Sequence, residues 1–476
     1  MTREEIEAKV WRACDIMRRD DNTKGIMKYM EQLSWLLFLK VFEAIEDQHE
    51  TEARLASRAY DRILDGEWRW SSWTTKDWPG EQLINFIAER LLPHLRSLSG
   101  TQQRDAVATI FRGISVVMKS PYNLKDVITV VNEIDFHRPE DAHTISVAYE
   151  QLLSKMGSEA GLSGEFYTPR PIVRFMVNVV DSKLGETVYD PFSGSAGFLI
   201  EAHAHMRKGR RLTVDQELVL QTRTFFGQES GDLPTLLGVM NMILHGVSAP
   251  NILRRNTLEQ DVRNIPPAER HDVILTNPPF GGKENQQIQQ NFPVQSQSTE
   301  LLALQHVMKK LKPGGRCGMV VPEGLLFRGD AFAQVKKDLL ENYNLYAIVS
   351  LPSGAFTNAG IKTDLLFFER TGPTRQVWYY ELLPPNGERF TKGNPVVDAH
   401  FDECLQLMRE RAVTERSWIS RPEDLAEHGY DLTPRNPVPK KGGDLRSPED
   451  ILAGMVEKQR EIVDILGDLQ RRLTNQ

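Results

Sequence analysis

Apolar residues recur along the chain with two different periods, and the change of period divides it into regions. From residue 1 to about 155 the spacing is that of helices, as in KYMEQLSWLLFLKVFEAIEDQ, where apolar side chains stand three and four positions apart. From about 160 to 370, short apolar runs alternate with helix-like stretches; the runs are ETVYDPF, RTFFGQE, HDVILTNPP, GRCGMVVPE, LYAIVSLP and TDLLFFER. This alternation predicts an α/β domain with a parallel sheet and crossover helices.

The pattern weakens beyond residue 370 and returns near the end of the chain. PPNGERFTKGNP and TPRNPVPKKGGDLRSP have the proline, glycine and charge typical of linkers. Ser447 and Pro448 are typical of a helix start, and the apolar residues behind them follow the three-and-four spacing of a coiled-coil seam. We therefore predict a helical domain over 1–155, an α/β domain over 156–385, and a linker with a helix over 386–476. That helix docks on a partner or packs on its own chain.

One feature of the helical domain has two interpretations. The segment WRWSSWTTKDWPG carries four of the eight tryptophans and is predicted to be an irregular loop with aromatic anchors. These side chains either fill the core between helices, which we favour, or form a surface for a partner or DNA.

Composition excludes several classes of protein. Apolar residues make up 40% of the chain and charged ones 26%, and no apolar run approaches the length of a membrane span. The start MTREEIEAKVW lacks the apolar stretch of a secretory signal, so we expect a cytoplasmic protein that does not enter membranes. Three scattered cysteines, Cys14, Cys317 and Cys404, predict neither a zinc site nor a disulfide framework, and no metal is expected.

The charge balance limits how the chain could hold nucleic acid. With 58 basic and 65 acidic residues the formal net charge is −7, so bulk electrostatics opposes binding. A local basic surface or a partner subunit would have to supply the attraction for nucleic acid. The basic cluster in MRKGRRLTVDQELVLQTR is one candidate, although a solvated helix face explains it more simply.

The first predicted strand-to-helix turn of the α/β domain is VYDPFSGSAGFLI, residues 188–200. Asp190 ends the strand, and Gly194 and Gly197 let the backbone bend tightly and approach a ligand. The turn lacks both the Gly-x-Gly-x-x-Gly spacing of a pyrophosphate binder and the Gly-Lys-Ser/Thr ending of a P-loop. A cofactor without phosphates therefore fits better than NAD or ATP, and a purely structural loop is the alternative.

The next strand, in TFFGQES, places Glu229 at its carboxyl end. An acidic side chain at that position can accept hydrogen bonds from both ribose hydroxyls of an adenosine. A solvated carboxylate is the simpler alternative when Glu229 is considered alone.

The strand in DVILTNPPFGGKE ends in a rigid corner formed by Asn277, Pro278, Pro279 and Phe280. The exocyclic amine of adenine is a poor nucleophile because its lone pair is delocalised into the ring. Hydrogen bonds from the amine to the Asn277 side-chain oxygen and the Pro278 carbonyl would favour a tetrahedral nitrogen, and Phe280 could stack on a flipped base. The alternative is a proline-rich turn without function.

These motifs, read in order, resemble the modification subunit of type I restriction-modification systems. The matching stretches are GEFYTPRPIVRFMV (164–177), DPFSGSAGF (190–198), GQES (227–230), NPPF (277–280), LKPGGRCGMVVPEGLLF (311–327) and LPSGAFTNAGIKTDLLFF (351–368). That family comprises S-adenosylmethionine-dependent N6-adenine DNA methyltransferases. The resemblance implies a Rossmann-like methyltransferase core over 156–385, with a helical N-terminal domain and a C-terminal helical tail.

The resemblance also implies which residues bind the methyl donor, S-adenosyl-L-methionine. Besides Asp190, Gly194 and Glu229, these are Glu165, Phe166, Tyr167, Thr168, Pro169, Arg170, Ser195, Ala196 and Gly197. Asn256 stands where the family usually has an aspartate near the adenine of the donor. Because its side chain can still accept a hydrogen bond from that adenine, we expect donor binding to be weakened rather than lost.

Implied partners are double-stranded DNA, a separate specificity subunit that reads the sequence, a second copy of this chain, and a restriction subunit where one is present. Two alternatives remain open at this stage. Asn-Pro-Pro-aromatic corners also serve protein-glutamine N5-methyltransferases, and the chain could be a non-catalytic assembly component of a defence complex.

Overall fold

The computed structural model describes residues 3–135, 168–356, 361–391, 393–437 and 459. The chain divides into two compact units, Met1–Pro434 and Arg435–Gln476. The predicted coiled-coil helix belongs to the second unit and lies outside the described residues apart from position 459. Glu165, Phe166 and Tyr167 also lie outside them.

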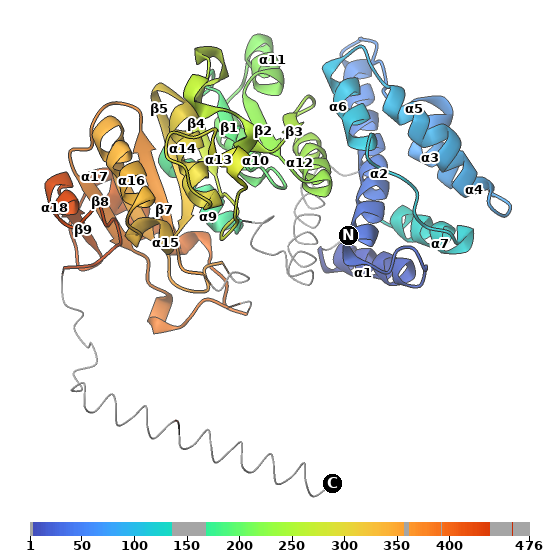
Figure 1. The fold of residues 1–476 in the computed structure, drawn as a ribbon. Helices are drawn as coiled ribbons and strands as arrows, with labels where there is room; N and C mark the ends of the chain where they lie inside the picture. Colours follow the sequence, from blue (N-terminus) through green and yellow to red (C-terminus); the bar gives the residue numbers. More distant parts are fainter. Residues whose placement is uncertain (1–2, 136–167, 357–360, 392, 438–458, 460–476) are drawn as a thin grey trace, which may run out of the picture. The chain divides into compact units, whose positions relative to one another are not determined.

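The N-terminal region is helical, as its apolar spacing predicts. Its elements, the first in the colour order of Figure 1, are α1 (Arg3–Arg18), α2 (Ile26–Leu55), η1 (Gly66–Trp68), α3 (Trp70–Thr74), α4 (Gln82–Asn85), η2 (Phe86–Leu91), α5 (Leu92–Ser97), α6 (Gln102–Phe111) and α7 (Pro121–Asn132). Ser120 and Thr101 cap α7 and α6 by accepting hydrogen bonds from the third residue beyond them.

The tryptophan-rich segment differs from the predicted irregular loop because it forms the short helices η1 and α3. Trp70 and Trp73 are buried with ring centroids 5.0 Å apart. The indole N–H of Trp70 donates to Asn132 of α7 at 2.7 Å, which satisfies its polar atom inside the core. The interpretation of these two side chains as core anchors is therefore confirmed.

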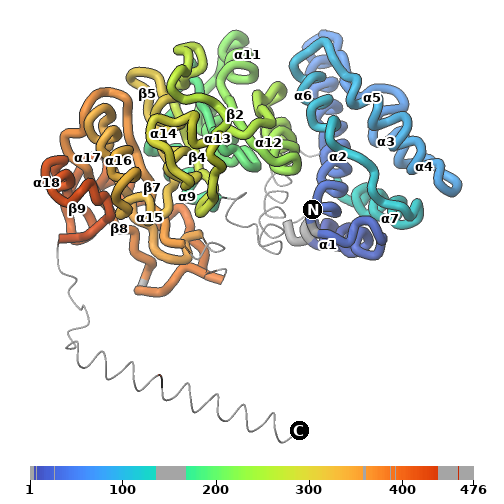
Figure 2. Tube along the Cα trace, viewed as in Figure 1, coloured from blue at the N-terminus to red at the C-terminus, as the bar shows by residue number. Residues whose placement is uncertain are grey.

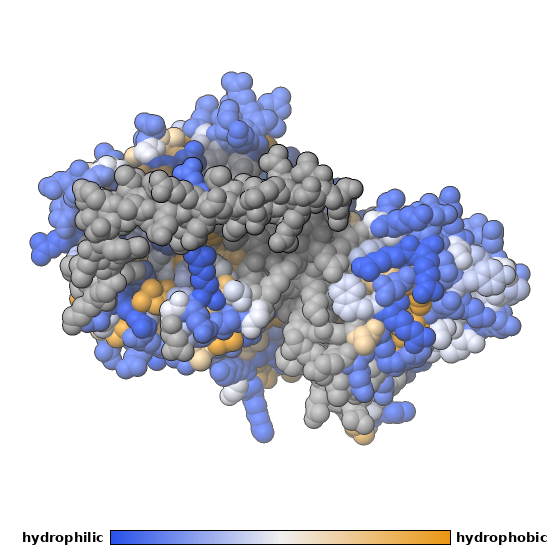
Figure 3. Space-filling view, turned by 90° about the horizontal axis from the view of Figure 1, so that it is seen from below, coloured by the Kyte–Doolittle hydropathy of each residue, from blue (hydrophilic) through white to orange (hydrophobic). Residues whose placement is uncertain are grey.

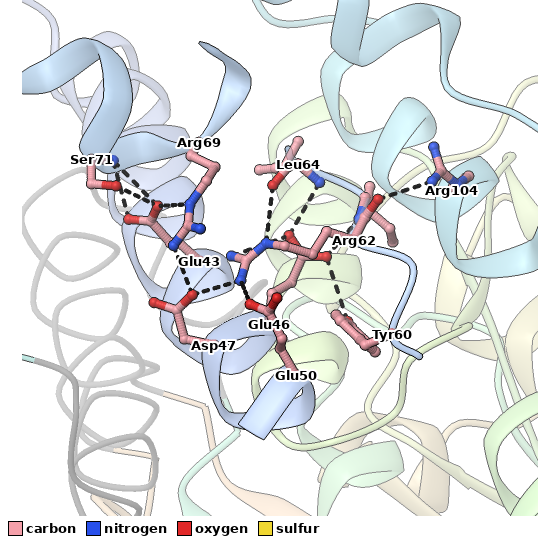
Figure 4. Close-up of polar contacts among 11 residues, drawn as sticks. Glu43, Glu46, Asp47, Glu50, Tyr60, Arg62, Leu64, Arg69, Ser71 and Arg104 are labelled. Carbon is pink, nitrogen blue, oxygen red and sulfur yellow. Dashed lines mark hydrogen bonds and ion pairs between the residues drawn. The ribbon is translucent and has the colours of Figure 1, made fainter. Parts of the chain in front are cut away.

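A buried network of charges fastens helix α2 to the loop that follows it (Figure 4). The Glu46 carboxylate accepts hydrogen bonds from the backbone N–H groups of Ile63 at 2.6 Å and Leu64 at 3.1 Å. The guanidinium of Arg62 lies 2.6 Å from the carboxylate of Asp47. Burial raises the pKa of Glu46, and the backbone N–H groups and Arg62 oppose that rise.

A nine-stranded sheet forms the centre of the α/β region, in the order β3-β2-β1-β4-β5-β7-β6-β8-β9. The strands are β1 (Val188–Asp190), β2 (Phe225–Glu229), β3 (Asn251–Arg254), β4 (His271–Thr276), β5 (Leu311–Pro322), β6 (Asn344–Ser350), β7 (Thr363–Glu369), β8 (Val377–Glu381) and β9 (Ser417–Ser420). Figure 2 lets the reader follow the chain through the strands from green to orange.

The five strands from β3 to β5 pair in parallel, as predicted, but β7 runs antiparallel to both β5 and β6. The sheet is therefore mixed, which corrects the expectation of a parallel sheet. The connection from β6 to β7 contains no helix in its described part, and a parallel return would need a crossover of that kind.

Helices cover both faces of the sheet (Figure 1). On β7, Leu365 and Phe367 pack in one apolar cluster with side chains of α9 (Arg170–Val180), α10 (Gly197–Arg207) and α12 (Asp232–Leu244). The alternate residues Leu366 and Phe368 pack in a second cluster with α14 (Thr299–Lys310) and α16 (Ala331–Asn342). Strands buried on both faces read as continuous apolar runs, and this explains TDLLFFE.

The basic cluster lies at the end of α10 and in the segment before α11 (Val214–Thr222). Its side chains are exposed, and Arg207 pairs with Glu217 of α11. This pairing favours the interpretation as a solvated face.

Residues 398–427 fold with the sheet although the sequence predicts a linker there. They form η7 (Asp398–Phe401), α17 (Asp402–Glu410), β9 and α18 (Pro422–Glu427). The ring of Trp418 on β9 stacks on Tyr379 of β8 with centroids 5.3 Å apart. The sequence pattern missed this part because short elements without a clear period depend on such tertiary pairing.

In the view of Figure 3 the described surface is mostly hydrophilic, with small apolar areas between charged side chains. None of the helices in the described part of the chain combines the length and apolar character needed to cross a membrane.

Candidate active site

The candidate site lies where the order of the sheet reverses. Strand β1 pairs with β2 on one side and with β4 on the other, so the chain winds away from β1 in both directions. Ligands of open α/β sheets bind outside the carboxyl ends of the strands at such a point. Asp190 ends β1 and Thr276 ends β4, directly before Asn277.

The glycine-containing turn after β1 adopts a tight, supported conformation. Gly194 has φ +48° and Ala196 φ +63°, and Ala196 is the N-cap residue directly before α10. A Cβ on Gly238 of α12 would lie 2.8 Å from the carbonyl oxygen of Gly194, so that helix packs directly on the turn. The Asn241 side chain donates to the Ser195 carbonyl at 2.8 Å. The turn is thus held in this conformation by its contacts with α12.

Asp190 is buried and joins the turn to β4. Its carboxylate accepts hydrogen bonds from the hydroxyl of Thr276 at 2.7 Å and from the N–H of Phe192 at 3.1 Å. Burial raises the pKa of Asp190 to about 7, and the nearby Glu229 carboxylate adds to the rise while the two hydrogen bonds oppose it. The observed hydrogen bonds of Asp190 therefore stabilise the fold, because they connect the glycine-containing turn to the end of β4.

Glu229, at the end of β2, uses both carboxylate oxygens. One accepts from the N–H of Gly194 at 3.1 Å and the other from the N–H of Gly231 at 2.9 Å. Each oxygen of an ionised carboxylate can accept further hydrogen bonds. Glu229 is half-buried, so it can hold the turn and still face a ligand.

A cavity of about 250 Å³ opens beside Glu229. Its walls include the apolar side chains of Phe192, Leu258 and Pro279, with Glu229 and Asn256 among the polar groups. The oxygen of Asn256 accepts a hydrogen bond from the N–H of Leu258 at 3.1 Å, so one of its two lone pairs is already used. Flat apolar walls with a carboxylate fit the base and the diol of a nucleoside.

A second hollow, of about 20 Å³, lies between the glycine turn and the end of β4. Asn277 lines it and donates from its side-chain nitrogen to the hydroxyl of Thr168 at 3.1 Å. Its side-chain oxygen is buried and has no hydrogen-bond partner among the described residues. Pro278 is buried, whereas Phe280 is half-buried and packs against the core.

Thr168, Pro169 and Arg170 lead into α9 beside the same hollow. The guanidinium of Arg170 donates to the carbonyl oxygen of Gly197 at 2.8 Å, which links this segment to the start of α10. Burial lowers the pKa of Arg170 to about 10. The structure thus brings together every predicted site residue that it describes, along the carboxyl edge of β1, β2 and β4.

Sequence reasoning missed two contacts in this site. From the sequence, Thr276 is only the end of an apolar strand, yet its hydroxyl donates a hydrogen bond that links β4 to Asp190. Thr168 was expected to bind the methyl donor, and its side chain also holds the Asn277 carboxamide. The signal for Thr276 is a hydroxyl residue placed directly before Asn-Pro-Pro-Phe; the pairing of Thr168 with Asn277 has no local signal.

The reversal point, the supported glycine turn and the strand-end carboxylate define the class I methyltransferase fold. Known proteins agree with this assignment. The N-6 DNA Methylase family matches residues 140–443, and the HsdM N-terminal domain matches residues 6–131. The chain is 35% identical to the EcoEI methylase subunit of a type I restriction enzyme from Escherichia coli, over 96% of this chain and 95% of the relative.

Solved structures give the same picture. A chain from a structure of the type I R-M system has a TM-score of 0.78 at 52% identity and covers 100% of this chain and 99% of its own. A type I modification subunit from Vibrio vulnificus YJ016 has a TM-score of 0.86 at 39% identity, over 92% of this chain and 97% of its own. The chain belongs to the family of type I restriction enzyme methylase subunits and is an adenine-specific DNA methyltransferase.

Proposed function

We propose that the chain uses S-adenosyl-L-methionine to methylate N6 of an adenine flipped out of double-stranded DNA, with Asn277 as the main catalytic residue. The observation that carries the proposal is the buried Asn277 oxygen without a partner among the described residues. A buried acceptor left unpaired costs stability, so its retention at a strand end beside a ligand-sized cavity points to a donor supplied by the substrate.

The residues of the cavity suit the donor. Glu229 would accept the ribose hydroxyls, and Phe192, Leu258 and Pro279 would enclose the adenine. The turn residues Ser195, Ala196 and Gly197, with Thr168, Pro169 and Arg170, would enclose its methionine end. When bound, S-adenosylmethionine supplies a methyl group activated on a sulfonium.

On the target side the chain has to make the adenine amine more nucleophilic. The Asn277 oxygen would accept one amine hydrogen and the Pro278 carbonyl the other, which draws the lone pair out of the ring. The double proline fixes the direction of that carbonyl because both φ angles are locked. Phe280 would stack on the flipped base.

We further propose that a separate specificity subunit selects the DNA sequence and that two copies of this chain act with it. A net charge of −7 supports this division, because the chain alone has no bulk attraction for DNA. The cavity and the carboxyl edge belong to this chain, while base recognition would belong to its partner.

The test combines donor binding with methyl transfer. Calorimetry on the full chain measures S-adenosylmethionine binding, and radiolabelled transfer to genomic DNA lacking adenine methylation follows, with and without the specificity protein. We expect binding in both cases and transfer with the partner, and Asn277→Ala should abolish most transfer while keeping donor affinity within about threefold. Normal transfer by Asn277→Ala would refute the catalytic role, and methylation of a glutamine peptide instead of DNA would refute the substrate.

A further inference from the structure

The Asn277 carboxamide has two possible orientations, and only one of them suits the proposed reaction. Its oxygen must face the adenine amine, so its NH₂ group must face away. In the structure the nitrogen lies 3.1 Å from the hydroxyl oxygen of Thr168, and the buried oxygen is left unpaired. In this orientation the oxygen, and not the nitrogen, is the group left for a substrate donor.

The residues after Asn277 explain why its oxygen stays unpaired. An asparagine or aspartate side chain commonly accepts a hydrogen bond from the backbone N–H two residues further on. Asn256 does so with Leu258 at 3.1 Å in this same site. The equivalent position after Asn277 is Pro279, which has no N–H, and Pro278 has none either. The double proline thus removes the local donors that would capture the oxygen.

The hydroxyl of Thr168 holds the carboxamide in place, because it lies 3.1 Å from the Asn277 nitrogen and accepts its hydrogen bond. If the carboxamide were turned by 180°, its NH₂ group would occupy the buried position of the oxygen, and the Thr168 hydroxyl would donate to the oxygen instead of accepting from the nitrogen. An unpaired buried N–H group is rarer in proteins than an under-used carbonyl oxygen. With the nitrogen on Thr168, one of its two N–H groups is paired, and the buried oxygen is left for a partner.

We propose that Thr168 is a positioning residue that holds the Asn277 carboxamide with its oxygen toward the target amine. Its hydroxyl acts through Asn277, whereas its backbone is the part that would enclose the methionine end of the methyl donor. This inference rests on the proposed function of Asn277, and it predicts that the Thr168 hydroxyl affects the rate of transfer more than the affinity for either substrate.

The experiment compares Thr168→Val, which has the same shape without the hydroxyl, with Thr168→Ser, which keeps the hydroxyl. Single-turnover methyl transfer is measured with the full chain under the conditions in which the unsubstituted chain reacts, and donor affinity by calorimetry. Thr168→Val should slow transfer about 10- to 100-fold while donor affinity changes by less than about threefold. Thr168→Ser should recover the rate to within about threefold. Thr168→Ala also lacks the hydroxyl, adds no bulk, and should be slow like Thr168→Val.

A normal rate in both variants that lack the hydroxyl would overturn the inference. So would a loss of donor affinity equal to the loss of rate, because the hydroxyl would then serve the donor. Asn277→Ala separates this inference from the proposed function. If Asn277→Ala reacts normally, the proposed function fails; if it is inactive while the hydroxyl-free variants react normally, only the role of Thr168 fails.

Discussion

Replacing Thr276 with valine removes the hydroxyl that supports the buried Asp190 and leaves the shape of the strand end unchanged. The lost hydrogen bond is 2.7 Å long, and it is made to a carboxylate that is 1% exposed. Hydrogen bonds to charged groups contribute about 1.5–3 kcal/mol, so the variant should be destabilised mainly when Asp190 is ionised. The cost should therefore depend on pH.

The direction of the pH dependence follows from the raised pKa of Asp190. Its folded value is about 7, against 3.8 for an ordinary aspartate. The folded chain therefore holds this proton more tightly than the unfolded chain, and the stability from Asp190 falls as pH rises from about 4 to about 7. The hydrogen bond from Thr276 limits the rise of the Asp190 pKa. Without the Thr276 hydroxyl, the loss of stability with rising pH therefore continues to a higher pH.

The size of the effect can be worked out. If the ionised Asp190 carboxylate loses about 2 kcal/mol of stabilisation when the Thr276 hydroxyl is removed, its pKa rises by about 1.5, to about 8.5. The free energy of unfolding then drops by about 1 kcal/mol more at pH 8 than at pH 6 in Thr276→Val, relative to the unsubstituted chain. Urea unfolding at pH 6, 7 and 8 measures this difference.

Thr129→Val serves as the control, because the Thr129 hydroxyl lies on an exposed face of α7 and donates to Lys125 of its own helix. Its effect should be the same at every pH. If Thr276→Val also destabilises the chain equally at pH 6 and pH 8, the role assigned to the Thr276 hydroxyl is wrong.

Three further changes test other parts of the fold. Glu46→Ala should lower the free energy of unfolding by about 2–4 kcal/mol in urea, because the two buried backbone N–H groups of Ile63 and Leu64 lose their acceptor, at about 1–3 kcal/mol each, while Arg62 keeps its pairing with Asp47. Gly282→Ala should reduce methyl transfer, since a Cβ there would lie 2.4 Å from the hydroxyl of Thr299 and displace the loop after Phe280. His306→Gln should make unfolding less pH-dependent below pH 6.5: burial holds the pKa of His306 well below 6.5, so stability is lost as pH falls, by up to about 1.4 kcal/mol per pH unit.

Each of these changes has its own check. Glu52→Ala, on the exposed end of α2, should cost less than about 0.5 kcal/mol, and a similar value for Glu46→Ala would contradict the network. The Cβ added in Gly324→Ala meets nothing within 4 Å, so this variant should leave methyl transfer unchanged. An equal loss of transfer in both glycine variants would contradict the claim that displacement of the loop after Phe280 slows the reaction. For His306→Gln the comparison is the exposed His428→Gln, and an unaltered slope in His306→Gln would refute the argument.

The sequence by itself determined the period changes, the order of the motifs and therefore the class of fold. Strands such as TDLLFFE are apolar at consecutive positions in their centre, from Leu365 to Phe368, and a sheet covered on both faces accommodates that pattern. The residues that end β1, β2 and β4 were also predictable, because the carboxyl ends of parallel strands share one edge wherever the strands are ordered by crossovers. Asn277 and Glu229 could be named from this rule and their local motifs alone.

Tertiary structure decided what the local pattern does not encode. The antiparallel β7, and strand β9 with the helices beyond residue 385, depend on pairings between distant segments, such as Trp418 on Tyr379. The contacts of Thr276 with Asp190 and of Thr168 with Asn277 join residues far apart in the chain. A side-chain hydrogen bond acts over about 3 Å. Whether a hydroxyl group meets a carboxylate or a carboxamide is therefore fixed only when the fold brings the two segments together.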